Sequence, residues 1–412
     1  MHPIYENLPQ ILLVLIVILI ITLFVYIKLA FPFWNRQPVY HTYDIWRWIY
    51  RNPFRIHQRF TPLMKSKFCE LMNVEIVPFA NATDDQKKVF VNLLQCYSLN
   101  SESSLYMFHL ENLDAYLSGH LYSSYMSFYK QPYYKKPSTE YDISNVIMAD
   151  EPIGCISSRS GELFVNNIRE PIYYIDHLII QRNKDLRGIS RKLFETHIYK
   201  TNVISKMELL LEPIMVYLFR RDRELLSGIV PLVRFTVSNY VLPNNSSFYT
   251  QTRLPEHVVL VDIHSGNMDL LLDILNASRT LFHVFAITDI SNLIGLIKSG
   301  LIYAYVLKRF DDILGLYVFR DTRIQEEESG SILELVCSIQ INRELFYNGF
   351  LHALGDIHKK HKAFKLLRAD SVSNNSLIYW DEFYKIHDSI SAYYIYNYVV
   401  PTSPVNNAFI LF

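Results

Sequence analysis

Residues 74–97 read VEIVPFANATDDQKKVFVNLLQCY, an apolar strand pattern followed directly by an amphipathic helix pattern. Val and Ile dominate the first part, and both favour extended backbone. Thr83 and Gln86 have the spacing of a capping box, which marks the start of a helix. The apolar residues of that helix recur every three or four positions, at Val89, Phe90, Leu93, Leu94 and Tyr97. This stretch predicts a strand that leads straight into a helix.

The same order recurs later in the chain. His257–Asp262 has a strand pattern, and a helix pattern follows through Leu270, Leu271, Ile274 and Leu275. Each copy is followed by a hairpin candidate. The first covers Ile153–Val165 with a turn at Ser160–Gly161, and the second covers Leu301–Phe319 with a turn at Asp311–Asp312.

A core-like strand and a long helix come next in both copies. They cover 172–180 and 188–200 in the first copy, and 332–341 and 343–360 in the second. An order that occurs twice indicates an internal structural duplication. The expected fold class is therefore α+β, built from two tandem halves, and the polar stretch 244–253 is the best candidate junction.

Composition and charge narrow the function. The chain has 412 residues, of which 50% are hydrophobic, so it can bury a large core. Its 40 Lys and Arg residues balance its 40 Asp and Glu residues, which argues against an electrostatically driven nucleic-acid binder. A small molecule, a peptide or a membrane is the expected partner. The 30 tyrosines and many asparagines suggest an AT-rich genome such as that of some viruses.

Cysteine spacing predicts neither a disulfide framework nor a metal site. The four cysteines are widely scattered, which suits a reducing compartment, and they are Cys69, Cys96, Cys155 and Cys337. Asp356, His358 and His361 fit the basic last turn of a helix better than a metal site. We expect no metal.

Residues 11–31 read ILLVLIVILIITLFVYIKLAF and contain one charge, Lys28. This length reaches the roughly 20 residues needed to cross a bilayer. Residues 1–10 contain no Lys or Arg, whereas several follow the apolar run, so positive-inside logic places the large domain in the cytosol. The sequence predicts a short tail, one uncleaved transmembrane helix at 11–31 and a single-pass protein.

The segment after the apolar run, Phe31-Pro-Phe-Trp-Asn-Arg-Gln-Pro-Val39, resembles the FWxxQPV segment of the N-myristoyltransferases. Further pieces follow in the order of that family: 90–108 is similar to its helix and acidic loop, Ile153–Ile156 to its VGFI strand, and 393–398 to its YYLYNW strand. The resemblance covers about Phe33 to Phe412. It implies two GNAT-like halves in one saddle-shaped sheet with flanking helices. Residues 33–250 would then hold acyl-CoA, and residues 251–412 would hold the peptide.

Ile180–Ser190 forms a basic strand-to-helix turn, where backbone N–H groups and the helix dipole can bind pyrophosphate. A solvated charged turn is the alternative. The turn resembles the CoA loop of the family, which implies myristoyl-CoA as acyl donor. The cofactor-binding residues implied in this way are Phe33, Trp34, Gln37, Arg182, Lys184, Arg187, Gly188, Ile189 and Ser190.

The catalytic groups implied by the resemblance are main-chain groups. The family's oxyanion donors, two amides in NFLCV, fall on His177 and Leu178, although His177 replaces an aromatic residue. The family's base is the C-terminal carboxylate, which here belongs to Phe412. The apolar run Asn407–Phe412 independently predicts a buried chain end, for which a final edge strand is the plainer interpretation.

The peptide site departs most from the family. The resemblance places substrate-binding residues at Ser205, Tyr393 and Asp388, but the glycines of the family's KFGxGDG are lost, and its histidine becomes Arg221. Two functions therefore remain open. One is transfer of a long acyl chain from acyl-CoA to the N-terminal glycine of a protein. The other is an inactive, membrane-anchored structural or binding protein that recognises acylated chains. A GNAT-type acetyltransferase is a third alternative.

Overall fold

A computed structural model describes residues 8–30, 33–44, 49, 52–57, 65–99, 104–135, 147–182, 186–208, 214–251, 253–327 and 330–412. The chain begins with α1 (Leu8–Ala30). The first half then contains η1 (Trp34–Arg36), β1 (Phe54–Arg55), β2 (Val74–Pro78), η2 (Phe79–Asn81), α3 (Asp84–Tyr97), β3 (Ser104–Tyr106), α4 (Leu110–Leu117), β4 (Tyr125–Lys135), β5 (Ile147–Val165), β6 (Ile168–Ile180), α5 (Leu186–Glu208), β7 (Val216–Asp222), β8 (Val233–Val241) and α6 (Ser246–Tyr249).

The second half contains a similar series. It comprises β9 (Val258–Asp262), α7 (Met268–Ser278), η3 (Arg279–Leu281), β10 (Val284–Thr288), α8 (Ile290–Lys298), β11 (Ile302–Arg309), β12 (Asp312–Glu326), β13 (Gly330–Gln340), α9 (Arg343–Lys360), β14 (Phe364–Asp370), η4 (Ser373–Leu377), β15 (Tyr384–Tyr396), β16 (Tyr398–Val399), η5 (Val405–Asn407) and β17 (Ala408–Leu411).

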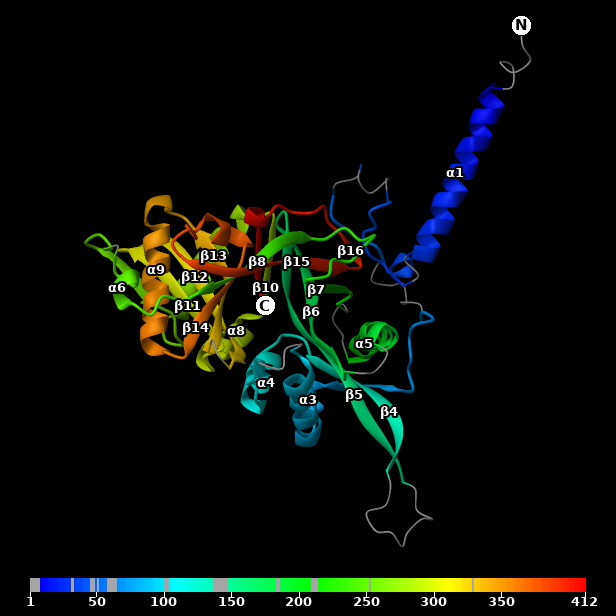
Figure 1. Ribbon diagram of the computed structural model, residues 1–412, viewed down its shortest axis with the longest axis horizontal. Coiled ribbons are helices and arrows are strands. Elements are labelled where there is room, and N and C mark those ends of the chain that lie inside the picture. The colour runs from blue at the N-terminus through cyan, green and yellow to red at the C-terminus, as the bar shows by residue number, and fades with distance from the viewer. Residues whose placement is uncertain are drawn as a thin grey trace.

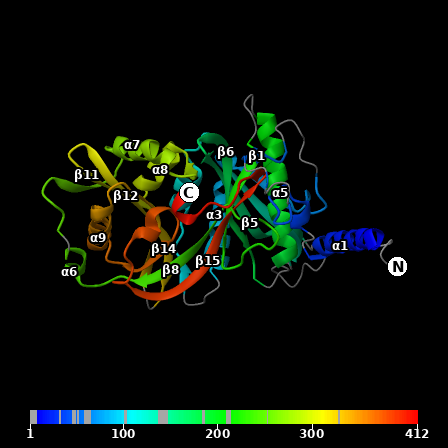
Figure 2. The same ribbon diagram turned by 90° about the horizontal axis from the view of Figure 1, so that it is seen from above.

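The predicted duplication is confirmed. In the first half an antiparallel meander, β4–β5–β6, is followed by helix α5 and by β7, which pairs parallel with β6. In the second half β11–β12–β13 is followed by α9 and by β14, which pairs parallel with β13. Helices α5 and α9 lie at opposite ends of the molecule (Figures 1 and 2). Thr83 and Gln86 form the predicted capping box at the start of α3.

One large sheet joins the halves. Its order is β17-β10-β5-β6-β7-β15-β8-β14-β13-β12-β11-β9, with β4 and β2 added beside β5 and with β3 beside β12. Strand β15, late in the sequence, lies between β7 and β8, and β10 pairs with β5. The halves thus exchange strands, and the sheet continues across residue 250, where the sequence suggested a junction. The C-terminus lies centrally, between the two halves (Figures 1 and 2).

The hairpin predicted with a turn at Ser160–Gly161 is wrong. Strand β5 runs through these residues, where Gly161 pairs with Ile172 on one side and Thr288 on the other. The turn falls instead at Asn166–Asn167, whose φ angles of 49° and 66° suit the two-residue loop between β5 and β6. The second hairpin is present, but its turn lies at 310–311, one residue earlier than predicted, because β11 ends at Arg309 and β12 starts at Asp312.

Helix α1 extends away from the body of the molecule (Figures 1 and 2). The part from Pro9 to Ala30 is long and apolar enough to cross a membrane, and its most apolar 18 residues are not buried against the rest of the described chain.

A buried asparagine ties helix α8 to helix α4. Asn292 is fully buried, and its Nδ2 donates to the carbonyl oxygens of Ala115, Tyr116 and Ser118 at 2.7–3.2 Å. Its Oδ1 accepts from Thr288 at 2.8 Å. These bonds fix the contact between the two halves of the duplication.

We expect Asn292→Ala to lower the free energy of unfolding by about 3 kcal/mol, because the buried carbonyl groups would lose their donor. The measurement is denaturant unfolding of the full chain. Asn276→Ala, at an exposed position on α7, serves as control and should change the free energy by less than about 0.5 kcal/mol. An equal decrease in the free energy of unfolding for both substitutions would contradict the conclusion that Asn292 holds α8 against α4.

Candidate active site

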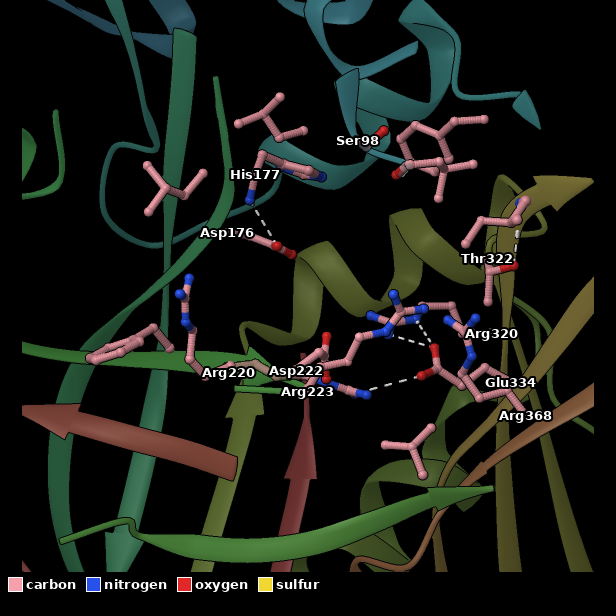
Figure 3. A pocket seen from close by; sticks show the side chains of 18 of the residues that line it. Ser98, Asp176, His177, Arg220, Asp222, Arg223, Arg320, Thr322, Glu334 and Arg368 are labelled. Carbon is pink, nitrogen blue, oxygen red and sulfur yellow. Dashed lines mark hydrogen bonds and ion pairs between the residues drawn. The ribbon is translucent and has the colours of Figure 1, made fainter. Parts of the chain in front are cut away.

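A cleft of about 1180 Å³ opens between the two halves. The first half contributes Phe33, Trp34, Ser190 and the segment Ile175–Ile179. The second half contributes residues of β12–β15 and Phe412. Side chains from β6, β7, β12, β13 and β14 project into this cavity (Figure 3).

A β-bulge shapes the wall at Ile175–Ile179. The register between β5 and β6 shifts between Cys155 and Ser157, and His177 adopts a left-handed φ of 56°. A regular strand would turn alternate residues away from the cleft, whereas consecutive residues line it here. His177 and Leu178, the predicted oxyanion donors, are among them.

Asp176 lies at the centre of a hydrogen-bond network. Its Oδ2 accepts from the Tyr116 hydroxyl at 2.5 Å. Its Oδ1 accepts from the His177 N–H at 2.8 Å (Figure 3). Burial by itself would raise the pKa of Asp176, but His177, the Tyr116 hydroxyl and Arg159 together lower it. The carboxylate is therefore ionised at neutral pH, and the His177 amide already has an acceptor.

The chain end is buried, as predicted. Strand β17 pairs parallel with β10, and the Phe412 side chain is 4% exposed. Its ring stacks on Tyr174 with a centroid distance of 4.8 Å. The main-chain oxygen of Phe412 accepts from Arg320 Nη1 at 3.2 Å. This end of the chain lines the cleft.

An ion-pair network forms the floor of the cleft, and sequence reasoning missed it. Glu334 pairs with Arg320 at 2.5 Å, and Arg220 pairs with Asp370 at 2.6 Å and with Asp222 at 2.8 Å. Burial alone would raise the pKa of Glu334, but Arg320 and Arg220 lower it to about 2. The partners come from β7, β12, β13 and β14, so only the strand order of the folded sheet reveals the network.

The residues predicted to bind the cofactor lie in different places. Phe33, Trp34 and Ser190 line the cleft, and the Trp34 ring stacks on Phe219 at 6.0 Å. Arg182 donates to the carbonyl oxygen of Leu99, a lining residue, and so lies at the rim. Gln37 is buried away from the cleft, where its Oε1 accepts from Tyr396 at 3.0 Å.

The predicted strand-to-helix turn is present, because β6 ends at Ile180 and α5 begins at Leu186. Arg187, Gly188 and Ile189 therefore belong to the first turn of α5. Lys184 lies outside the described residues.

The structure does not bring the predicted peptide-binding side chains into the cleft. Ser205 is buried on α5, where its hydroxyl donates to Asn202 O at 3.2 Å. Tyr393 is buried against Phe235. Asp388 accepts a hydrogen bond from Ser238 at 2.6 Å. Side chains alternate along β15, so the cleft is lined by its neighbours His387 and Ser389 and not by Asp388.

Comparison with known proteins shows the fold. No protein-family profile and no curated protein sequence matches this chain. Among solved structures, Saccharomyces cerevisiae N-myristoyltransferase with bound myristoyl-CoA superposes with a TM-score of 0.65 at 12% identity, covering 92% of this chain and 91% of that one. A structure of the same yeast enzyme with myristoyl-CoA and inhibitors gives a TM-score of 0.62 at 14% identity, with coverage of 92% and 93%. The chain has the N-myristoyltransferase fold.

Proposed function

We propose that this protein is a membrane-anchored acyltransferase that moves a long acyl chain from acyl-CoA to the N-terminal glycine of a protein. The observation that carries the proposal is the continuity of the cleft. It is lined by Phe33, Trp34 and Ser190, by the bulge at His177 and by the buried end of the chain at Phe412. The donor, the reacting carbonyl and the base of an N-myristoyltransferase would therefore share one cavity.

Acyl-CoA would lie at the start of α5. The backbone N–H groups of its first turn and the positive end of the helix dipole favour phosphate there. Arg182, Lys184 and Arg187 would add positive charge, with Gly188, Ile189 and Ser190 beside them. Myristoyl-CoA is the donor that the yeast enzyme binds, and we extend it to this chain as part of the proposal.

The amides of His177 and Leu178 would stabilise the oxyanion that forms when the amine attacks the thioester. The His177 amide donates to Asp176 Oδ1. It would therefore have to exchange this acceptor for the developing oxyanion. The resemblance assigns the second donor to the amide of Leu178, and Leu178 lines the cleft.

The Phe412 carboxylate would accept a proton from the incoming glycine ammonium, which is the role that the resemblance implies. Its proximity to the cleft supports this role. Arg320 beside the main-chain oxygen would hold the carboxylate in place.

Helix α1 would anchor the protein, with residues 11–31 in the bilayer and the large domain in the cytosol. Long-chain acyl-CoA partitions to membranes, and each buried methylene of an acyl chain adds about 0.8 kcal/mol to membrane binding. An anchored enzyme would therefore meet its donor and leave its product at the same surface.

Calorimetry on the full chain in lipid nanodiscs tests the proposal. We expect myristoyl-CoA to bind tightly and acetyl-CoA not to compete, after which glycine-terminated peptides should accept the acyl chain. Empty nanodiscs provide the control for partitioning of the donor into lipid. Preference for acetyl-CoA would favour a GNAT-type acetyltransferase, and binding of neither donor would contradict both enzymes.

The second candidate is an inactive, anchored protein that recognises acylated chains. The positions of Ser205 and Asp388 outside the cleft favour it, because the acceptor site of the family is then incomplete. Tight binding of myristoyl-CoA or of a myristoylated peptide without any transfer would support this candidate.

A further inference from the structure

The side chain of His177 lies on the cleft wall, unlike the side chain of a residue packed within a regular strand. The left-handed φ of 56° and the bulge carry it onto the cleft wall, directly beside the amides proposed to hold the oxyanion. Three rings enclose the imidazole, with centroid distances of 5.1 Å to Tyr116, 5.8 Å to Phe108 and 5.9 Å to Phe90. The imidazole therefore packs among aromatic side chains at the cleft wall.

Hydrogen bonding assigns the tautomer. Ser157 Oγ lies 2.9 Å from His177 Nδ1 and 3.4 Å from the carbonyl oxygen of Asp176. The Asp176 carbonyl can only accept, so the arrangement that satisfies both contacts has the Ser157 hydroxyl donating to that carbonyl and accepting from Nδ1–H. In this tautomer Nε2 carries the lone pair.

Nε2 opens to the cleft. It has no hydrogen-bond partner within the described ranges, and it is not one of their buried unsatisfied atoms. His197 differs in this respect, because its Nδ1 bonds Ser127 at 2.7 Å while its Nε2 is buried without a partner. Only an atom that meets solvent or ligand can exchange a proton with a substrate.

Burial, reinforced by two arginines, keeps the ring neutral. Asp176 on β6 faces it, as do Arg159 on β5, Arg320 on β12 and the Tyr116 hydroxyl on α4. Burial lowers the pKa of His177, Asp176 raises it, and the two arginines lower it again, with a net decrease below 6.5. A neutral imidazole at pH 7 is available as a base.

We propose that Nε2 of His177 is a proton acceptor for the attacking amine, in addition to the Phe412 carboxylate. This inference rests on the proposed acyl transfer. An ammonium must lose two protons to become an amide nitrogen, and the Phe412 carboxylate takes the first of them. The free amine then forms a C–N bond to the thioester carbon, Nε2 takes the second proton from that nitrogen, and the C–S bond breaks. The imidazolium passes its proton to the departing CoA thiolate, and the Phe412 carboxyl group releases its proton to solvent.

Chemical labelling tests the placement without any activity. Diethylpyrocarbonate modifies accessible neutral imidazole nitrogens, and mass spectrometry of the full chain in nanodiscs would locate the modification. We expect His177 to be labelled and to be protected at least tenfold by myristoyl-CoA. The exposed His264 should be labelled with or without the donor, and the buried His197 should stay unlabelled. An unlabelled His177 would overturn the inference.

Two variants test the chemistry. His177→Phe keeps an aromatic ring in the pocket, and we expect kcat to fall about a hundredfold or more, with myristoyl-CoA affinity and thermal midpoint unchanged. The fall of kcat/KM at acid pH, with an apparent pKa below 6.5, should disappear as well. His177→Gly suits the left-handed backbone and leaves a space, so added imidazole should restore turnover.

The outcomes separate the two proposals. If the wild-type chain transfers no acyl group, the proposed function fails, whereas the labelling still decides whether Nε2 faces the donor site. If the wild-type chain is active and His177→Phe retains its kcat and its pH profile, His177 is a packed side chain and the inference is overturned.

Discussion

Converting the Phe412 carboxylate to an amide is expected to lower kcat by about a hundredfold or more while leaving myristoyl-CoA binding unchanged. The chain end is buried at the cleft, with its ring on Tyr174 and its main-chain oxygen on Arg320. An amide cannot accept the proton of an ammonium group, whereas Arg320 would keep its ion pair with Glu334. Single-turnover transfer from myristoyl-CoA to a glycine-terminated peptide is the measurement.

Semisynthesis supplies a matched control. A ligated chain with a free carboxylate carries the same junction as the amidated chain and should retain wild-type turnover. Adding one alanine after Phe412 provides an independent variant, because it moves the carboxylate by about 3.5 Å. If the amidated chain turned over as fast as its acid counterpart, the terminal carboxylate would not be a base. If only the thermal midpoint fell, the buried end would be structural.

Sequence patterns predicted the elements that depend on neighbouring residues. The capping box at Thr83 and the hairpin over Leu301–Phe319 both involve contacts between residues that are close along the chain. The duplicated order of elements followed from such local signals, and the saddle-shaped sheet followed from the resemblance. Where the resemblance specified main-chain groups, as at His177 and Leu178, it also placed them on the cleft.

Features that depend on distant residues were missed. The network of Arg220, Glu334 and Asp370 needs side chains from β7, β13 and β14 to meet, although β15 and β8 lie between β7 and β14 in the sheet. Ser205 and Asp388 were assigned by resemblance, but helix burial and strand alternation turn them from the cleft. Local periodicity cannot specify which strands become neighbours.

Gly161 shows the same limit, since a glycine inside a strand can mark a turn or a close approach. A Cβ at Gly161 would lie 2.5 Å from the carbonyl oxygen of Ile287 and 2.6 Å from the Phe412 ring. Phe412 lies at the end of the chain, so only the folded sheet explains the glycine. It provides space for the ring that positions the terminal carboxylate.

Gly161→Ala is therefore expected to displace Phe412 and to lower kcat by about a hundredfold, because a shift of about 1 Å at a catalytic group has an effect of that size. Transfer kinetics and myristoyl-CoA calorimetry, measured side by side, would separate loss of turnover from loss of donor binding. Gly315→Ala, whose new Cβ would lie 3.2 Å from Ile339 O on β13, is the matched control and should keep its turnover.

A second substitution distinguishes misplacement from misfolding. In the double variant Gly161→Ala with Phe412→Leu, the ring atoms that collide with the new methyl group are removed, while the terminal carboxylate remains. We expect roughly tenfold recovery of kcat, and only partial recovery because the contact with Ile287 persists. Recovery of turnover without a change in thermal midpoint would mean that the space at Gly161 affects the rate by positioning the Phe412 carboxylate. The double variant could instead stay as slow as Gly161→Ala while both keep the wild-type thermal midpoint. The position of the Phe412 ring would then not determine the rate. Proton transfer would depend on another group, for which His177 is the candidate proposed above.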